Sequence, residues 1–208
     1  PLQRVAGLAY GPAHALQWGE RERSVDFYDV KGDVQALLAP LQPTFEPDTH
    51  PAMHPGRCAR VVVQGQVLGH VGELHPRWKQ GWELPQAPVL FELDLDAVMA
   101  RPEPAFAALP RQQAALRDLA LVVGEAVAHD ALVHALRNDP QGLVRGATLF
   151  DIFKPTQAVA GMAAGERSLA VRLELLDDEA TLTDERIDAA VQAAVARAAA
   201  ACGARLRA

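Results

Sequence analysis

The sequence predicts an α+β chain of two successive units, the second a ferredoxin-like βαββαβ sandwich. Three observations lead to this prediction. Short apolar runs typical of strands recur along the chain, between segments with helical period. The segment Arg101–Pro110 holds three prolines, which is typical of a boundary between domains. After it, strand and helix patterns follow in the order β-α-β-β-α-β, in which both helices pack on one face of a four-stranded antiparallel sheet. We therefore expect units at residues 1–107 and 108–208.

Length and charge limit what the chain can be. Its 208 residues allow one large domain or two of about a hundred residues each, and 50% of them are hydrophobic, enough for a sizeable core. The net charge of −6 gives no sign of a generally basic nucleic-acid protein. Residues 108–208 alone hold 11 Lys and Arg against 13 Asp and Glu, a net charge of −2. Any contact with RNA there must come from a local patch rather than from the overall field.

The cysteines and the apolar runs point to a cytoplasmic protein without a membrane span. Cys58 and Cys202 lie far apart and form no CxxC motif, which suits a reducing cytosol and argues against a disulfide framework. No apolar run approaches the ~20 residues that a membrane helix needs. The chain begins with PLQRVAGLAYG, which lacks the apolar core of a signal peptide and starts inside a predicted strand. We expect a fragment of a longer protein.

The first unit is predicted to begin with a strand over Arg4–Gly11. A helix follows Gly32, with Asp33 as its N-cap, and the prolines near residue 40 end it. The Pro- and His-rich segment Phe45–Pro55 is predicted to be irregular. Beyond it, CARVVVQGQVLGHVGELHP predicts a hairpin in which Gly65 supplies the positive φ of a tight turn. A strand over Val89–Leu95 and a helical turn over residues 96–99 complete the unit.

The second unit is predicted to hold six elements. Thr183 is an expected N-cap, although the position three residues later holds Arg186 and the capping box is incomplete. Gly203 is an expected helix stop. The strands and helices in chain order are Leu116–Val123, Asp130–Asn138, Leu143–Phe153, Arg167–Leu176, Asp184–Cys202 and Ala204–Arg207.

The strands Leu143–Phe153 and Arg167–Leu176 carry the candidate site. Alternate residues from Leu169 to Leu175 form an unbroken apolar face, which predicts the core side of the sheet. Assuming uninterrupted alternation, the opposite face would carry an acid, an aromatic ring, a hydroxyl and a cation: Asp151, Phe153, Ser168 and Arg172. An aromatic ring beside an acid can stack a planar base and accept hydrogen bonds from its edge, as on small open sheets that bind single-stranded RNA. The alternative is an ordinary solvated face with one stray aromatic ring.

Other groups of polar residues were considered for chemistry. His50, His54 and Cys58 could bind zinc, but a fourth ligand is missing nearby, and an ordered loop is the interpretation we favour. A structured strand end is the interpretation we favour for the group His70, Glu73 and His75, because an acid–base role would need a cleft and a partner.

The adjacent Arg117 and Asp118 could suggest a buried ion pair. Neighbouring residues on a strand point to opposite faces, however. We therefore expect Asp118 to bond to backbone or to a loop.

Several segments together resemble the family of bacterial phenylalanyl-tRNA synthetase beta chains, in its C-terminal part. VDFYDVKGDVQALL is similar to the FFDLKG segment of that family, and HPGRCARVVVQGQVLGHVGELHP to its HPGRSA…G…iGelHP hairpin. VLFELDLDAV resembles the strand that follows. RDLALVV, LFDIF, RSLAVRLEL and TLTDERI resemble the family's ferredoxin-fold anticodon-binding domain. The order and spacing of these motifs cover nearly the whole chain.

For the first unit, the resemblance implies a catalytic-like module with the antiparallel sheet of class II synthetases but no active site. Arg57 and Arg60 flank Cys58 without the glycine pattern of a nucleotide-binding strand. In the family this module packs on the alpha chain, which makes the phenylalanyl-adenylate in an alpha2beta2 heterotetramer. The whole enzyme would use ATP and Mg²⁺ to join phenylalanine to tRNA(Phe). The fragment itself is expected to have no catalytic residue and no metal site, and to bind no cofactor.

For the second unit, the resemblance implies binding of the anticodon stem-loop. Family members place an Asp and an aromatic residue on the second strand, and a Ser on the third, against the first anticodon base. By motif these fall on Asp151, Phe153 and Ser168, although family members often have Tyr where this chain has Phe153. Stacking survives that change and a phenolic hydrogen bond does not. Arg172 and Lys154 are candidate phosphate contacts, with solvated surface charge as the alternative.

Two functions of other classes compete with this interpretation. Ferredoxin-like sandwiches also serve as small-molecule-sensing domains that dimerise, and as structural interaction modules, so the fold alone does not choose. An exposed Phe with Asp and Ser favours RNA. A ligand-sensing dimer would instead need an apolar seam on the open face.

Overall fold

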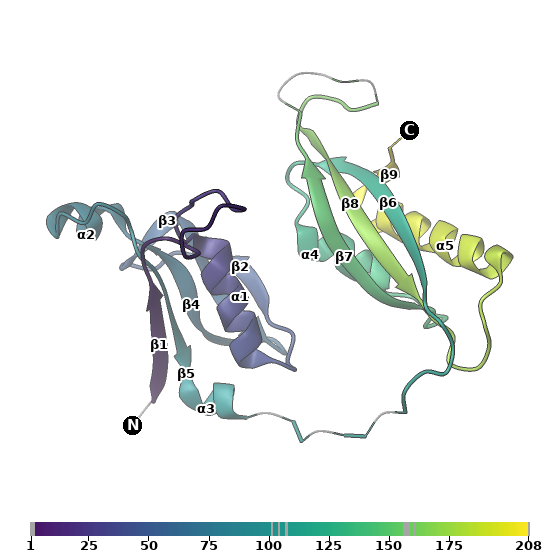
Figure 1. The fold of residues 1–208 in the computed structure, drawn as a ribbon, viewed down its shortest axis with the longest axis horizontal. Coiled ribbons are helices and arrows are strands. Elements are labelled where there is room, and N and C mark those ends of the chain that lie inside the picture. Colours follow the sequence, from purple (N-terminus) through teal and green to yellow (C-terminus); the bar gives the residue numbers. More distant parts are fainter. Residues whose placement is uncertain are drawn as a thin grey trace. The chain divides into compact units, whose positions relative to one another are not determined.

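The computed structural model describes residues 3–100, 102–103, 105–106, 108–155, 159 and 161–207. The chain divides into two compact units, Pro1–Ala105 and Phe106–Ala208 (Figure 1). Each unit contains one antiparallel sheet with helices, so the predicted α+β class is confirmed. Within the proline-rich segment, Pro104 lies outside the described residues.

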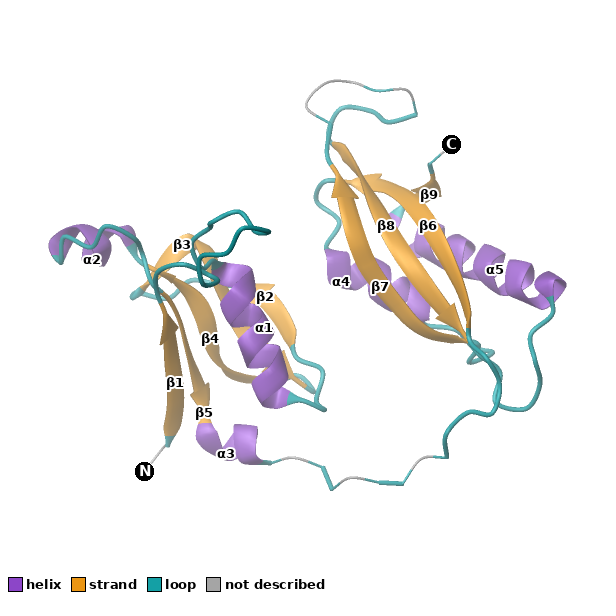
Figure 2. Ribbon diagram, in the orientation of Figure 1, coloured by secondary structure: helices purple, strands orange, loops and turns teal. Residues whose placement is uncertain are grey.

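The first unit is a five-stranded antiparallel sheet in the order β1-β5-β4-β3-β2 (Figure 2). Helix α1 packs on one face of the sheet and buries Val30, Val34 and Leu38 there. The strands are β1 Arg4–Ala9, β2 Thr44–Pro47, β3 Met53–Val63, β4 Gln66–Leu74 and β5 Val89–Asp94, and the helices are α1 Phe27–Leu38, α2 Pro76–Gly81 and α3 Leu95–Met99.

Helix α1 begins seven residues earlier than an N-cap at Asp33 would place it, so Asp33 as its N-cap is wrong. The N-cap is Asp26, whose carboxylate accepts hydrogen bonds from the backbone N–H groups of Tyr28 and Asp29. The Asp29 side chain accepts one in return from the Asp26 N–H at 2.8 Å, which completes a capping box. Gly32 lies inside the helix despite its low helix propensity, because the buried stripe of the helix continues on both sides of it.

The segment Phe45–Pro55, predicted to be irregular, is regular at both ends, where it contains most of β2 and the start of β3. Thr44–Pro47 pairs with β3 at the edge of the sheet, an edge position at which a proline is tolerated. The predicted hairpin between β3 and β4 is present, and its turn residues Gln64 and Gly65 have φ of 50° and 80°. A tight turn with positive φ at both central residues matches the twist of the two strands that it joins. The role predicted for Gly65 is therefore confirmed.

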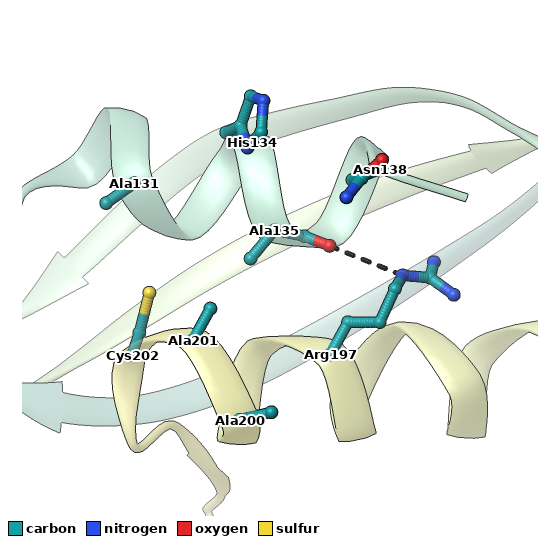
Figure 3. A pocket seen from close by; sticks show the side chains of 8 residues that line it. All are labelled: Ala131, His134, Ala135, Asn138, Arg197, Ala200, Ala201 and Cys202. Atoms are coloured by element: carbon teal, nitrogen blue, oxygen red, sulfur yellow. Dashed lines mark hydrogen bonds between the residues drawn. The ribbon is translucent and has the colours of Figure 1, made fainter. Parts of the chain in front are cut away.

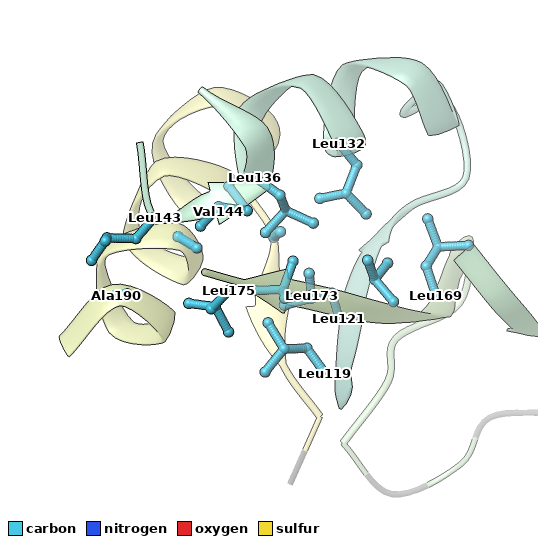
Figure 4. Packing of buried hydrophobic residues seen from close by; sticks show 14 of the residues in the cluster. Leu119, Leu121, Leu132, Leu136, Leu143, Val144, Leu169, Leu173, Leu175 and Ala190 are labelled. Carbon is cyan, nitrogen blue, oxygen red and sulfur yellow. The ribbon is translucent and has the colours of Figure 1, made fainter. Parts of the chain in front are cut away.

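The second unit is a four-stranded antiparallel sheet in the order β7-β8-β6-β9, with both helices on one face (Figure 2). This order is that of a ferredoxin-like sandwich, as predicted. Leucines of β6, β8 and α4 fill the space between the sheet and the helices (Figure 4). The elements are β6 Ala115–Gly124, α4 His129–Arg137, β7 Val144–Phe153, β8 Glu166–Leu175, α5 Asp184–Cys202 and β9 Arg205–Leu206.

Helix α5 has both of its predicted ends. The Thr183 hydroxyl accepts from the Arg186 N–H at 3.4 Å, and Gly203 takes the left-handed conformation at φ 65°. Its buried stripe consists of Ile187 and three alanines, at positions 190, 194 and 198, whereas Val191 and Val195 are only half-buried. Small side chains on this stripe allow the helix to approach the sheet closely.

Candidate nucleic-acid interface

The face of the second sheet opposite the helices carries the predicted site residues, and we call it the open sheet face. Side chains alternate across a strand, so the pairing register fixes which residues share this face. They include Asp118, Ala120 and Val122 of β6, Asp151 and Phe153 of β7, Ser168, Ala170 and Arg172 of β8, and Arg205 and Arg207 at β9.

A bulge in β7 sets the direction of two of these side chains. Leu149 pairs with Val171 and Asp151 pairs with Ala170, so Phe150 is an extra residue without a partner in the ladder. Uninterrupted alternation, which puts Leu149 and Asp151 on one face, is therefore wrong. Leu149 packs against the core, whereas Asp151 lies on the open sheet face with Ala170.

Asp151 and Phe153 are both accessible on this face. Within the part of the chain that the structure describes, no hydrogen bond or ion pair engages the Asp151 carboxylate. The Phe153 side chain is 38% exposed. An unpaired carboxylate beside an exposed ring can accept hydrogen bonds from a base edge while the ring stacks the base.

Ser168 lies on this face but is not accessible to solvent. It lies opposite Phe153 and is only 3% exposed. Its neighbour on β6, Val122, is fully buried. In this structure Ser168 therefore supports the strand under Phe153 rather than presenting its hydroxyl to solvent.

The two predicted phosphate contacts are paired with carboxylates. Arg172 makes two hydrogen bonds of 2.7 Å to the carboxylate of Asp118, and these bonds hold the pKa of Asp118 below its ordinary value. The prediction that Asp118 bonds to backbone or a loop is wrong, because the register places it directly opposite Arg172 on one face. Lys154 forms an ion pair with Glu125, whose pKa is lowered by that hydrogen bond.

Two arginines at the C-terminal strand were missed as site residues. Arg205 binds both carboxylate oxygens of Glu166 at 2.7 Å and donates to the Gly161 carbonyl at 2.8 Å. The guanidinium carbon of Arg207 lies 4.6 Å from the centroid of the Phe153 ring. The signal was present, since residues two apart on a strand share a face.

The ion pair of Glu166 with Arg205 makes the stability of this unit vary with pH in the acid range. The Arg205 hydrogen bonds, and one from the Ala163 N–H, lower the pKa of Glu166 from its ordinary value of 4.5 to about 2. A lowered pKa in the folded state contributes stability that is complete above about pH 4.5 and is lost as the pH falls towards about 2. We expect the difference in free energy of unfolding between the parent chain and Glu166→Gln to shrink over that range. Urea titrations at several pH values would measure it, and a constant difference would contradict the pairing.

A groove of this unit lies between α4 and α5, away from the open sheet face (Figure 3). It has a volume of about 550 Å³ and is lined mainly by alanines, with His134, Asn138, Arg197 and Cys202. Arg197 donates to the carbonyls of Ala135 and Leu136 at 3.4 and 3.1 Å. The guanidinium thus satisfies carbonyls at the end of α4, and none of the predicted site residues lines the groove.

The histidines of the first unit make local contacts. The Nδ1 atoms of His50 and His54 accept from backbone N–H groups two residues later, at 3.2 and 3.0 Å. Cys58 is buried with its sulfur 3.5 Å from that of Met53, and burial raises the pKa of its thiol. Among residues 3–100 and the other described segments, no group of three or more His, Cys, Asp or Glu is placed to hold a metal ion.

The second histidine-rich group is likewise divided among separate contacts. His70 lies 3.0 Å from Asp48, and Glu73 pairs with Arg57 at 2.6 Å. His75 is the N-cap of α2, where its ring nitrogen accepts from a backbone N–H. A membrane-spanning helix is not found either: no helix of the described segments has the length and apolar character to cross a bilayer.

Comparison with known families agrees with this fold. The family described as "Ferredoxin-fold anticodon binding domain" matches residues 110–207, over the unit that carries the open sheet face. The family described as "Phenylalanyl tRNA synthetase beta chain CLM domain" matches residues 2–95. Fold and matches together define a chain of the aminoacyl-tRNA synthetase class.

Similar proteins narrow this class to one family. The chain is 51% identical over 210 residues to the phenylalanine–tRNA ligase beta subunit of Ralstonia nicotianae, covering 99% of this chain and 26% of that protein. The beta subunit of Cupriavidus pinatubonensis is 49% identical, over 98% of this chain and 26% of that protein. The beta subunit of Neisseria gonorrhoeae is 43% identical, over 99% of this chain and 25% of that protein. The chain belongs to the phenylalanine–tRNA ligase beta subunit family, as the sequence motifs predicted. It spans about a quarter of the length of these curated relatives.

Proposed function

We propose that the open sheet face binds the anticodon stem-loop of tRNA(Phe). The observation that carries this proposal is the unpaired carboxylate of Asp151 beside the exposed ring of Phe153. Ionic side chains on the same face, such as Asp118 with Arg172, disfavour the alternative of a ligand-sensing dimer, which needs an apolar seam there.

Each side chain has a defined part in the proposed contact. The two oxygens of Asp151 accept from the N1–H and N2–H₂ groups of a guanine, while Phe153 stacks on its plane. Ser168 is buried, so it reaches the base only if the side chains around it move. Its main contribution is therefore to hold β8 in place. To contact phosphates, Lys154 and Arg172 give up their carboxylate partners. The lost ion pairs offset part of the gain, so the net contribution of these two cations to RNA affinity is small.

The remaining proposals concern the whole enzyme. We propose that residues 1–107 form the catalytic-like module that packs on the alpha chain, and that residues 108–208 act as the anticodon-binding domain. In the cytoplasm, an alpha2beta2 heterotetramer would use ATP and Mg²⁺ to form phenylalanyl-tRNA. This chain would supply tRNA contacts and support for the alpha chain, and neither nucleotide nor metal ligands. The resemblance and the relatives' names support this assignment.

Titration of the 208-residue chain with a tRNA(Phe) anticodon stem-loop tests the proposal. Asp151→Asn and Phe153→Ala are each expected to weaken binding by about 1–3 kcal/mol, because one removes acceptors from the base edge and the other removes a stacking surface. Fluorescence anisotropy at low salt measures the affinity, and amide spectra locate the contact.

Matched controls lie on the helix side of the sheet. Asp188→Asn removes the same charge from an exposed site on α5, and Ile152→Ala truncates a side chain that is 52% exposed on that side. Both are expected to leave the affinity within about twofold. Binding that is indifferent to the Asp151 and Phe153 variants would move the working surface elsewhere.

A further inference from the structure

Arg207 differs from the other basic side chains of the open sheet face. The other two, Arg172 and Arg205, are neutralised by Asp118 and Glu166, and Lys154, which follows Phe153 just beyond β7, is neutralised by Glu125. Among the residues that the structure describes, no carboxylate pairs with Arg207. In a unit with a net charge of −2, Arg207 is therefore a cation on this face that is already available to a ligand.

Arg207 lies directly across the sheet from the unpaired acid. Its backbone N–H donates to the Ala120 carbonyl at 2.8 Å, Ala120 pairs with Ala170, and Ala170 pairs with Asp151. Three strand spacings separate the ends of this row, or about 14 Å. Two alanines thus lie between the backbone of Asp151 at one end of the row and that of Arg207 at the other, and the Arg207 side chain reaches back across them to the Phe153 ring.

The guanidinium also occupies the surface on which a base would stack. At 4.6 Å from the ring centroid of Phe153, Arg207 makes a cation–π contact in the free protein. A base is about 3.4 Å thick along its stacking direction. Arg207 projects from the end of a two-residue edge strand, so a shift of that size needs only rotation of an exposed, flexible side chain.

We propose that Arg207 closes over the bound RNA base, holding it between the guanidinium plane and the Phe153 ring while Asp151 contacts the base edge. This inference rests on the proposed anticodon contact and deepens it. A guanidinium suits the role because it is planar, weakly hydrated and stacks on aromatic faces, whereas the ammonium of lysine is a compact, strongly hydrated charge. The contact therefore depends on shape as well as on charge.

Two substitutions of Arg207 distinguish stacking on the base from electrostatic attraction to the RNA. We expect Arg207→Ala and Arg207→Lys both to weaken binding of the tRNA(Phe) anticodon stem-loop by about tenfold. Retention of affinity by Arg207→Lys would assign the side chain a phosphate contact and overturn the stacking role. Arg137→Ala is the matched control, since it removes one positive charge from an exposed site on α4 and is expected to change affinity by less than about twofold.

A double variant and a spectroscopic signal complete the test. Because Phe153 and Arg207 hold the same base, their effects on RNA affinity are coupled. The fold-loss of affinity in the double variant Phe153→Ala with Arg207→Ala should be smaller than the product of the two single fold-losses. The Arg207 Hε resonance, shifted by the Phe153 ring in the free chain, should move on addition of RNA. Multiplicative losses, or an unmoved resonance, would contradict the sandwich.

The outcomes distinguish this inference from the function on which it rests. Absence of RNA binding by the parent chain, or indifference to Asp151→Asn and Phe153→Ala, overturns the anticodon contact and the inference with it. Binding that those two variants weaken but Arg207→Ala does not would leave the anticodon contact in place and overturn the inference alone.

Discussion

Replacement of Leu173 by alanine is expected to lower the free energy of unfolding of the unit Phe106–Ala208 by about 2–5 kcal/mol. Leu173 is fully buried in the middle of β8, in the cluster that joins the sheet to α4 and α5. Both flanking strands pair with β8 at this point, through Arg117 and Ala147. A cavity here is bounded by the sheet on one side and helices on the other, so it collapses only partly, and the lost contacts are not replaced.

Urea unfolding followed by amide signals of β8 measures this change. Leu116→Ala is the control, because Leu116 lies on the neighbouring strand with 53% of its surface exposed. Truncation there is expected to cost less than about 0.5 kcal/mol. A loss of less than about 1 kcal/mol for Leu173→Ala would show that the unit does not depend on the core described above.

Features that depend on a few neighbouring residues were predictable from the sequence. The ends of α5 follow from a hydroxyl and a glycine at the right positions, Thr183 and Gly203, and the β3–β4 turn follows from Gln64 and Gly65. The alternation of buried leucines in β8 predicted its core face. Such signals are local, because the groups that decide the structure lie within one turn of the chain.

Features that depend on a distant partner were not predictable from pattern alone. Strand β2 is short and becomes regular only by pairing with β3. The bulge at Phe150 reverses the alternation of β7, which no periodicity in the segment indicates. Asp118 finds Arg172, 54 residues away, because two strands align them. In each case the register between strands decides the contact.

The candidate site divides in the same way. Asp151 and Phe153 were assigned to the open sheet face by family motif as well as by alternation, and the bulge makes that assignment consistent with the core position of Leu149. Ser168 shares the face, but its burial depends on side chains that cover it in three dimensions. The location of Arg207 over the Phe153 ring required the position of a two-residue strand at the far edge of the sheet.

Asp139 is the second position where a single change is expected to have a large effect. Its side chain is 6% exposed, and one carboxylate oxygen accepts from the backbone N–H groups of Leu143 and Val144 at 2.8 and 3.1 Å. Arg197 of α5 lies 3.5 Å from the other oxygen. This carboxylate therefore links the segment after α4, the start of β7 and helix α5.

Asp139→Ala is expected to lower the free energy of unfolding by about 3 kcal/mol, because two N–H groups of buried residues lose a charged acceptor that nothing replaces. Asp139→Asn keeps an acceptor oxygen and loses only the charge, so we expect a cost of about 1 kcal/mol. The exposed Asp130 of α4 provides a control, and its replacement by alanine should cost less than about 0.5 kcal/mol. Equal losses for the alanine and asparagine variants of Asp139 would mean that the ion pair with Arg197, rather than the backbone hydrogen bonds, accounts for the stabilisation.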